Sequence, residues 1–242
     1  PTEGSYFSLE VEELLQRAKQ IADDMNRLQK KNTSIRVGLP TMIEALETPM
    51  LALFHKEHPE IRLELHHGTS LSLRKALQDD RIDIAIVSGK DTASDTMAAS
   101  AMRKIEIVYC VNRNHPHAQE KKLSLTQIAE DDLVEIENGQ HFRETILERF
   151  HMERCTPRIQ WSTTQLYTKL QLIRSGVAGG FLYRALADRE PDLVPISLEP
   201  PLSYEIEMLW QKNTAENETI RTFLDFARKH DVIQGSDGAD KG

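Results

Sequence analysis

Residues 34–89 read SIRVGLPTMIEALETPMLALFHKEHPEIRLELHHGTSLSLRKALQDDRIDIAIVSG. Short segments that are apolar, or that alternate apolar and polar residues, are separated here by longer segments whose apolar residues recur at helical spacing. The pattern predicts strands at 34–39, 61–67 and 82–87, with a helix in each interval. A β-α-β-α-β order of this kind is typical of an α/β domain built on a parallel sheet.

Local signals refine this prediction. The strand at 82–87 is almost fully apolar, as expected for a strand in the middle of a parallel sheet with both faces covered. Pro49 lies inside the first helix, which it should kink or restart, because proline has no backbone N–H. Thr69 and Ser70 follow the second strand and predict a side-chain cap for the second helix.

The remainder of the chain predicts a second α/β region. Residues 88–104 are polar and irregular, and a last amphipathic helix is expected at 215–230, before a disordered tail at 232–242. Further strands are predicted at 105–111, 133–136, 158–161, 177–183, 193–198 and 204–210, with a helix at 140–151 and a capped helix at 163–176 that ends in Gly176.

The N-terminal stretch FSLEVEELLQRAKQIADDMNRL, residues 7–28, has an apolar position at alternate steps of three and four. That 3.5-residue period predicts a coiled-coil helix that pairs with a second copy of the chain. An ordinary amphipathic helix packed on its own domain is the alternative. The seam positions are Phe7, Val11, Leu14, Ala18, Ile21, Met25 and Leu28.

Composition limits the class of protein. The 242 residues carry 30 Lys and Arg against 38 Asp and Glu, a net charge of -8 that argues against broad nucleic-acid binding by this segment. There is neither an apolar run of the roughly 20 residues that span a bilayer nor a signal-peptide pattern, so we expect a cytoplasmic protein. Cys110 and Cys155 are too few for a disulfide framework and fit reduced thiols.

Candidate catalytic and metal-binding groups are few. His66 and His67 are neighbours in a strand and point to opposite faces, so only one of them can serve a given site. Cys110 sits in an apolar strand, where inert packing is expected in preference to a redox switch with Cys155. No nucleophile-elbow, phosphate-loop, dinucleotide or zinc-protease motif is present. We therefore expect no enzyme activity, no metal and no cofactor.

Small polar residues follow four predicted strands, at 39–42, 68–70, 138–140 and 162–164. Such turns present backbone N–H groups and hydroxyls at helix N-termini, where anions bind well, and ligands of open α/β sheets lie beyond the carboxyl ends of strands. Each turn alone fits a simple helix cap. Four of them, from two α/β regions, favour a ligand-binding cleft.

The order of motifs resembles the effector-binding domain of LysR-type transcriptional regulators. VNRNHPHA is similar to that family's V-x-x-x-HP-x-A stretch, and LQLIRSGVAGGFLY to its L-x-x-V-x-x-G-x-G-I-x-x-L-P segment, with Tyr183 where proline is common. Pro40 before Thr41 and Met42 after it also depart from the family pattern. The positions that match the earlier motifs are Thr41, Phe54, Pro59, Ile61, Gly68 and Asp83 with Ile84, Ala85 and Ile86.

This resemblance implies an α/β fold like that of type 2 periplasmic binding proteins: two Rossmann-like subdomains joined by two crossover strands, after a long N-terminal linker helix. The crossovers are expected at 105–111 and 204–210. Subdomain I would comprise 34–106 and 210–231, and subdomain II 107–209, with 1–33 as the linker and dimerisation helix. A winged helix-turn-helix that binds DNA would precede this chain.

The resemblance further implies a small-molecule effector, either a carboxylate or another anion, held between the subdomains, and self-association as a dimer or tetramer with effector domains side by side and antiparallel. A solute-binding protein of the same fold is the alternative function. Carried over by position, the effector-binding residues are Pro40, Thr41, Met42, Thr69, Ser70, Val87, Ser88, Asn138, Gly139, Ser162 and Thr163.

Overall fold

The computed structural model of the chain describes residues 34–89, 94–137 and 140–236, together with Arg17. All seven positions of the predicted coiled-coil seam lie outside the described residues. Within the described part of the chain, none of the helices combines the length and apolar character that crossing a bilayer requires.

The first third of the chain folds in the predicted β-α-β-α-β order. β1 pairs with β2 on one side and with β3 on the other, and both pairings are parallel. The parallel pairing predicted for these strands is therefore confirmed, but β3 also pairs antiparallel with β9, so the complete sheet is mixed. The elements are β1 (Ser34–Leu39), α2 (Thr41–Glu57), β2 (Arg62–His67), α3 (Ser70–Gln78) and β3 (Ile84–Ser88).

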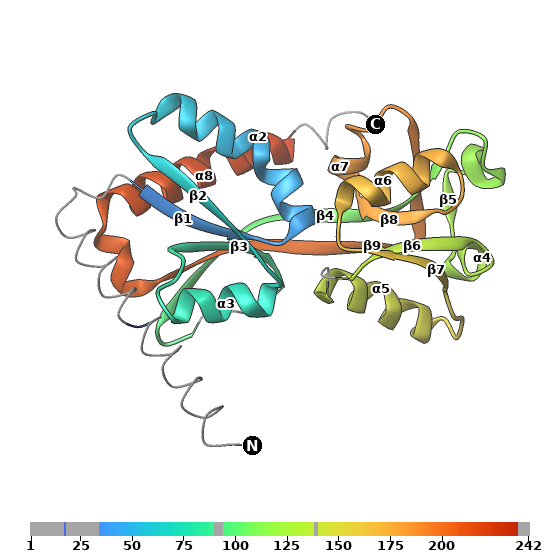
Figure 1. Cartoon of the computed structure of the whole chain (residues 1–242), viewed down its shortest axis with the longest axis horizontal. Coiled ribbons are helices and arrows are strands. Elements are labelled where there is room, and N and C mark those ends of the chain that lie inside the picture. Colours follow the sequence, from blue (N-terminus) through green and yellow to red (C-terminus); the bar gives the residue numbers. More distant parts are fainter. Residues whose placement is uncertain (1–16, 18–33, 90–93, 138–139, 237–242) are drawn as a thin grey trace, which may run out of the picture.

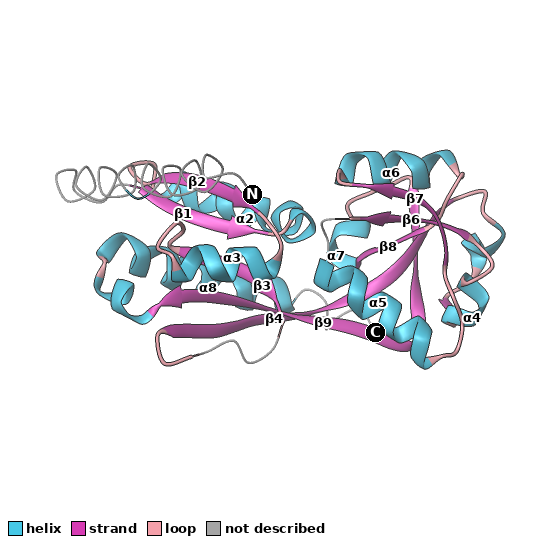
Figure 2. Cartoon of the chain, turned by 60° about the horizontal axis from the view of Figure 1, so that its bottom comes forward, coloured by secondary structure: helices cyan, strands magenta, loops and turns pink. Residues whose placement is uncertain are grey.

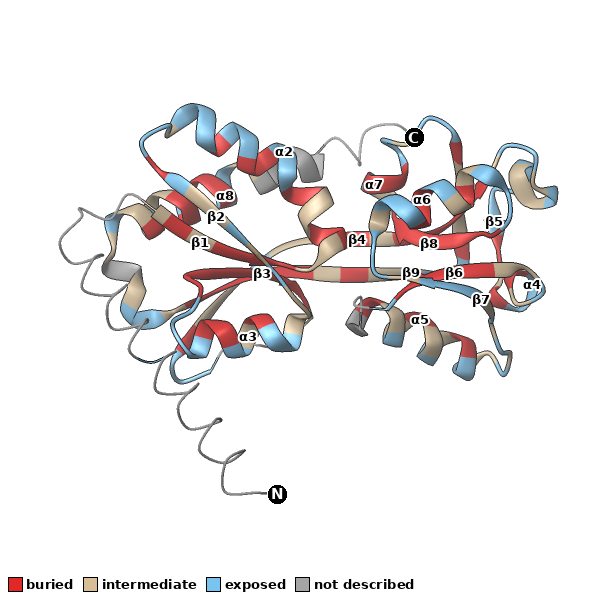
Figure 3. Ribbon diagram, viewed as in Figure 1, coloured by how far each residue is buried: buried red, intermediate tan, exposed pale blue. Residues whose placement is uncertain are grey.

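Helices cover both faces of this sheet. Ile84 and Ile86 of β3 pack in the cluster that contains α2 and α8 (Glu218–Ser236), whereas Ala85 and Val87 pack in a second cluster with α3. Because successive side chains of a strand point to opposite faces, an almost fully apolar strand needs cover on both sides. Figure 1 shows α2 and α8 on one side of β3 and α3 on the other, and Figure 3 shows that β3 between them is buried.

Two long strands, β4 (Met97–Asn112) and β9 (Leu193–Gln211), run from one end of the molecule to the other as an antiparallel pair (Figure 1). They contain the predicted crossovers. The expectation that 97–104 is irregular was wrong, because β4 begins at Met97. Ala98 and Ala99 carry little β-propensity of their own, but they pair with Trp210 and Leu209 of β9.

The predicted strands at 193–198 and 204–210 belong to this one element, β9, although its pairing is interrupted. Ile107 of β4 faces Leu202, and the next residue, Val108, faces Ser197. Residues 198–201 of β9 therefore have no partner in β4, although the β9 residues on both sides of them pair with neighbouring residues of β4. Pro200 and Pro201 lie in this segment and have no N–H to donate, which explains why the ladder breaks there.

The second half of the fold surrounds the other end of β4 and β9. β8 pairs with β4, β5 pairs with β9, and β6 pairs with β7 in parallel. We call β1–β3, α2, α3 and α8 the first unit, and β5–β8 with α4–α7 the second unit. The second unit contains β5 (Lys122–Leu123), α4 (Leu125–Ile128), β6 (Asp132–Ile136), α5 (Gln140–Met152), β7 (Arg158–Thr163), α6 (Leu166–Ser175), β8 (Gly180–Tyr183) and α7 (Arg184–Ala187).

Gly179 joins the two sheets of the second unit. Its N–H donates to the carbonyl of Asp132 at 2.8 Å, and its carbonyl accepts from the N–H of Val134 at 2.9 Å. A Cβ atom at this position would lie 2.0 Å from the hydroxyl oxygen of Tyr109, so only glycine fits. The glycine pair of VAGGFLY therefore serves close packing of a buried strand.

Two helix boundaries differ from the predictions. α6 begins after Gln165, whose side chain makes no capping bond, so the expected Ser/Thr cap is wrong there, although the helix ends at Gly176 with φ +78° as predicted. α8 continues to Ser236, five residues into the tail that was expected to be disordered. α2 continues through Pro49 and is not interrupted by it.

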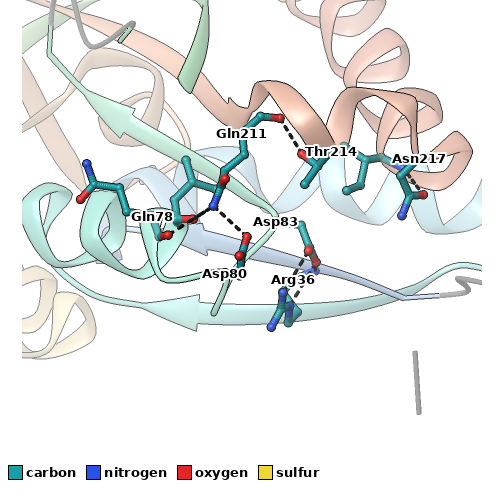
Figure 4. A network of polar contacts seen from close by, with 9 residues as sticks. Arg36, Gln78, Asp80, Asp83, Gln211, Thr214 and Asn217 are labelled. Carbon is teal, nitrogen blue, oxygen red and sulfur yellow. Dashed lines mark hydrogen bonds and ion pairs between the residues drawn. The ribbon is translucent and has the colours of Figure 1, made fainter. Parts of the chain in front are cut away.

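A polar network fastens the amino-terminal edge of the first sheet (Figure 4). The Asp83 carboxylate accepts hydrogen bonds from the backbone N–H of Arg36 at 2.8 Å and from its guanidinium Nε and Nη2 at 3.2 and 3.1 Å. Beside it, Gln211 at the end of β9 donates to the carboxylate of Asp80 at 2.7 Å. The carboxyl ends of β1, β2 and β3 lie at the opposite edge of the sheet, which is where ligands of open α/β sheets bind.

Candidate functional site

The carboxyl ends of the strands in the first unit lie at one edge. Leu39, the last residue of β1, faces His67, the last residue of β2, and Gly38 faces Ala85 of β3. The turns that follow β1 and β2, and the end of β3, therefore come together in space. Figures 1 and 2 show this edge directed toward the second unit, and β6 and β7 ending on the side directed toward the first.

The predicted residues of the first unit occupy this edge in different ways. Pro40 is the N-cap of α2 and makes no side-chain capping bond, and Thr41 begins that helix. Thr69 caps α3 as predicted, because its hydroxyl accepts a hydrogen bond from the N–H of Ser72 at 3.1 Å. Met42 and Val87 are buried in the two core clusters, so their side chains pack within the unit.

In the second unit, Ser162 and Thr163 form the end of β7, where Thr163 faces Ile136 of β6. The Thr163 hydroxyl accepts a hydrogen bond from the N–H of Gln165 at 3.1 Å. Asn138 and Gly139, which follow β6, lie outside the described residues.

Hydroxyl groups connect the two units where β9 passes between them. Ser88, at the end of β3, lies close enough to the phenols of Tyr183 in β8 and Tyr204 in β9 to lower the pKa of both. Thr145 of α5 donates to the Tyr204 hydroxyl at 3.2 Å. We call these four residues the hydroxyl cluster. Only Ser88 and Tyr183 had been noticed in the sequence, the latter because it replaces a common proline.

Burial sets the protonation of this cluster. Ser88, Tyr183 and Tyr204 are all buried, and burial raises the pKa of both phenols above the ordinary tyrosine value. The carboxylates of Glu144 and Glu148 raise the pKa of Tyr204 further. The phenols therefore remain neutral hydrogen-bonding groups at any physiological pH.

A cation of α3, Arg74, adjoins the cluster. Arg74 of α3 donates through Nη2 to the carbonyl of Ser88 at 3.5 Å and to the Oε1 atom of Glu207 at 3.3 Å. Its pKa is lowered because burial disfavours the charged form, although Glu207 and Tyr204 act in the opposite direction. Arg74 and Glu207 come from α3 and β9 and had no signal in the sequence.

The described residues hold no cluster of three or more potential metal ligands among His, Cys, Asp and Glu side chains. His67 instead pairs with Glu44, with Nδ1 and Oε2 2.9 Å apart. Both cysteines are free thiols, and burial raises the pKa of Cys110 to about 12, so that thiol is protonated and unreactive.

Comparison with known proteins now identifies the fold and the family. A family model for the LysR substrate binding domain matches residues 29–231. The chain belongs to this LysR family. The curated relative CmpR, an HTH-type transcriptional activator of Synechocystis, is 23% identical over 93% of the chain. TtuA, an HTH-type transcriptional regulator of Agrobacterium vitis, is 23% identical over 75% of the chain.

Solved structures show the same LysR fold. The HinK regulator of Pseudomonas aeruginosa superposes with a TM-score of 0.69 and 19% identity over 95% of this chain and 80% of HinK. The regulatory domain of CcmR from Synechocystis, solved in complex with 2-PG, superposes with a TM-score of 0.72 and 18% identity over 81% of this chain and 96% of that domain. The chain spans 74% of the length of CmpR and 61% of TtuA.

Proposed function

We propose that the chain is the ligand-sensing domain of a LysR-type regulator of transcription. The observation that carries the proposal is the meeting of two α/β units, joined along β4 and β9, with the ends of their strands directed toward each other, in a chain of this family. An effector that contacts both units stabilises one relative arrangement over another, which is the requirement for a sensor.

The proposed effector site lies between the units. The residues carried over from the family motif comprise Pro40, Thr41, Met42, Thr69, Ser70, Val87, Ser88, Asn138, Gly139, Ser162 and Thr163. The hydroxyls of Thr41 and Thr163 are the side chains that we expect to reach the ligand from opposite sides, since they begin α2 and end β7. Met42 and Val87 contribute through their backbones, because their side chains are buried.

The output of the domain would pass through residues 1–33. The seam from Phe7 to Leu28 would pair two copies and place a DNA-binding region of the whole protein, upstream of this chain, on its operator. A change in the arrangement of the units then alters the geometry of the paired helices. A cytoplasmic setting belongs to this proposal, because a bacterial regulator acts where the DNA is.

Self-association through the effector domains is also part of the proposal. Each unit exposes large apolar side chains along an edge strand and an adjoining helix. Leu53 and Leu65 of the first unit are 38% and 40% exposed, and Trp161 and Tyr167 of the second are 45% and 71% exposed. An antiparallel, side-by-side dimer would cover the first pair with the second, since unpartnered apolar surface favours association.

A thermal-shift screen of small metabolites tests the sensing function. A ligand that binds only the folded chain raises its melting temperature with concentration. We expect a hit whose effect is lost in Thr41→Ala and in Thr163→Ala but kept in Thr168→Ala, an exposed threonine of α6 that faces solvent. A hit that both site variants bind as well as the wild type would place the ligand elsewhere and refute the proposed site.

A further inference from the structure

Side chains from outside the first unit hold α2 one turn after it begins. Arg189 of the second unit donates through Nη1 to the carbonyl oxygens of Ala45 and Leu46, at 3.2 Å in each case. Arg103 of β4 forms an ion pair with Glu47, whose side chain is 1% exposed. Three consecutive residues of α2 are therefore bound to groups that do not belong to the first unit.

Arg189 is itself fixed to the second unit. Its backbone N–H donates to the carbonyl oxygen of Leu186 at 3.2 Å, in the turn that ends α7. Leu186 and Ala187 are 5% and 1% exposed and belong to the core cluster that also contains Leu46 of α2. Figure 1 shows α7 beside the N-terminal half of α2, with which it is in contact. The guanidinium thus joins two helices, one from each unit, at the place where they meet.

The strands that join the units form a narrow connection. β3 pairs with β9 as far as Ile206, and β8 begins to pair with β4 at Ile107. In the step between these points Ile105 faces Tyr204, and among the described residues the ladder there consists of β4 and β9 alone. Two-stranded ribbons twist more than wider sheets and are only marginally stable by themselves. Contacts beside the ladder therefore contribute to fixing the angle between the units.

We propose that Arg189 is a latch that restrains the separation of the two units. It acts on the helix that begins with Thr41, a residue of the proposed effector site. An effector binds only the fraction of chains whose units are in the competent arrangement, so a contact that raises this fraction also raises the apparent affinity. The inference goes beyond the sensing function, because it concerns the chain without a ligand.

Labelling of a buried thiol measures how often the units separate. Ala187 is 1% exposed and lies two residues from Arg189, so Ala187→Cys places a thiol beside the contact. Cys110, which is fully buried in β4, is a second reporter in the same chain, and Cys155→Ser removes the half-buried thiol. When reclosing is faster than labelling, the rate at each thiol follows the fraction of chains in which that thiol is exposed. Mass spectrometry of peptides measures the two rates separately.

Arg189→Gln should raise the labelling rate at position 187 about fivefold, the change in population expected from the loss of one hydrogen bond. The rate at position 187 should also exceed the rate at Cys110, because separation of the units leaves β4 paired with β8. An unchanged rate at position 187 overturns the inference. Equal rates at the two thiols overturn it too, since position 187 would then be exposed only by global unfolding.

Arg113→Gln is the matched control. Arg113 is exposed, as Arg189 is, and donates through Nη2 to the carbonyl oxygen of Pro191 at 2.6 Å, but this bond lies within the second unit. Its loss should leave the labelling rate at position 187 unchanged. If Arg113→Gln accelerates labelling as much as Arg189→Gln does, the effect is not specific to the contact between the units, and the latch is refuted.

A second reporter position keeps the test decisive. Should Ala187→Cys fail to fold, Leu46→Cys places the thiol on the α2 side of the same contact, at a position that is 1% exposed. The same fivefold acceleration by Arg189→Gln is expected there, and its absence overturns the inference. Because labelling needs no ligand, its outcome is independent of the thermal-shift screen, and either proposal can fail while the other stands.

Discussion

Arg189 of the second unit donates through Nη1 to the carbonyl oxygen of Ala45 in α2, at 3.2 Å. Ala45 is the residue four positions before Pro49, and proline has no N–H to complete the helical bond to that oxygen. The same guanidinium nitrogen lies 3.2 Å from the Leu46 carbonyl oxygen. A gap in the helical ladder of one unit thus provides an acceptor for the other unit.

A double-mutant cycle should measure this contact. Arg189→Gln should lower the free energy of unfolding by about 1 kcal/mol in the wild type, as expected for one hydrogen bond. In a Pro49→Ala background the cost should be smaller, because the restored N–H satisfies the Ala45 carbonyl. Urea unfolding of the four proteins gives the coupling energy. Equal costs in both backgrounds would show that Pro49 plays no part.

The buried Lys169–Glu135 pair should be replaceable by apolar residues. The Nζ and Oε2 atoms are 3.7 Å apart, both side chains are buried, and neither forms a hydrogen bond. Burial lowers the pKa of Lys169. We expect Lys169→Met alone to cost roughly 3 kcal/mol, since it leaves an unpaired buried carboxylate, whereas Lys169→Met with Glu135→Leu should be neutral or stabilising.

The exposed Lys122–Glu199 pair, with side chains 59% and 57% exposed, is the control for that experiment. Neutralising either partner should change the free energy of unfolding by less than about 1 kcal/mol. A double variant of the buried pair that is as unstable as Lys169→Met would contradict our view that the pair is dispensable.

Asp83 should be one of the most sensitive positions of the first unit. Its carboxylate is 4% exposed and accepts three hydrogen bonds from Arg36. Asp83→Asn retains the size but turns two of these charge-assisted bonds into weaker or repulsive contacts, so we expect a loss of about 2–4 kcal/mol in urea unfolding. Asp79→Asn, in an exposed pair with Arg81, should be close to neutral.

His115 should make stability fall in mild acid. Burial lowers its pKa below the ordinary value of 6.5, His117 acts in the same direction, and Asp131 opposes them. The unfolded chain therefore binds the proton more readily, and the free energy of unfolding decreases as the pH falls through about 6.5 toward the folded pKa. His115→Gln should show a shallower decline between pH 7.5 and 5.5; an unchanged slope would assign the effect to other groups.

The two thiols should differ in reactivity. Cys110 is buried with a pKa raised to about 12, while Cys155, whose pKa burial and Glu153 also raise, is only half-buried and within reach of a reagent. At pH 8 a thiol-specific chromogenic reagent should label one cysteine in the native chain and two after unfolding. Cys155→Ser should abolish the native reaction. Rapid labelling of that variant would mean that the strand around Cys110 opens readily.

The sequence predicted an element correctly where the intrinsic preferences of its residues match their surroundings in the fold. The run Ile84–Ser88 is apolar on both faces and lies in the middle of the first sheet. Thr69 follows a glycine at the end of a strand and caps a helix. The start of β4 was missed because Ala98 and Ala99 have no strand preference, and only their pairing with β9 makes them a strand.

The polar contacts between the units were harder to predict because they join distant parts of the chain. Arg74 and Glu207 are 133 positions apart, and Thr145 and Tyr204 are 59 apart. In the sequence each of these residues resembles an ordinary surface residue of a helix or a strand. The family resemblance predicts a site at the strand ends. It predicts nothing about side chains outside the family motifs, such as Arg74 and Glu207.

The position of β9 has a consequence for synthesis on the ribosome. β9 pairs with β3 from Ile84 to Ser88 and also with β4, yet it is made after all the other strands. Until residue 211 has emerged, β3 presents an unpaired apolar edge, which is a template for pairing with another chain. Chains truncated before 204 should therefore aggregate.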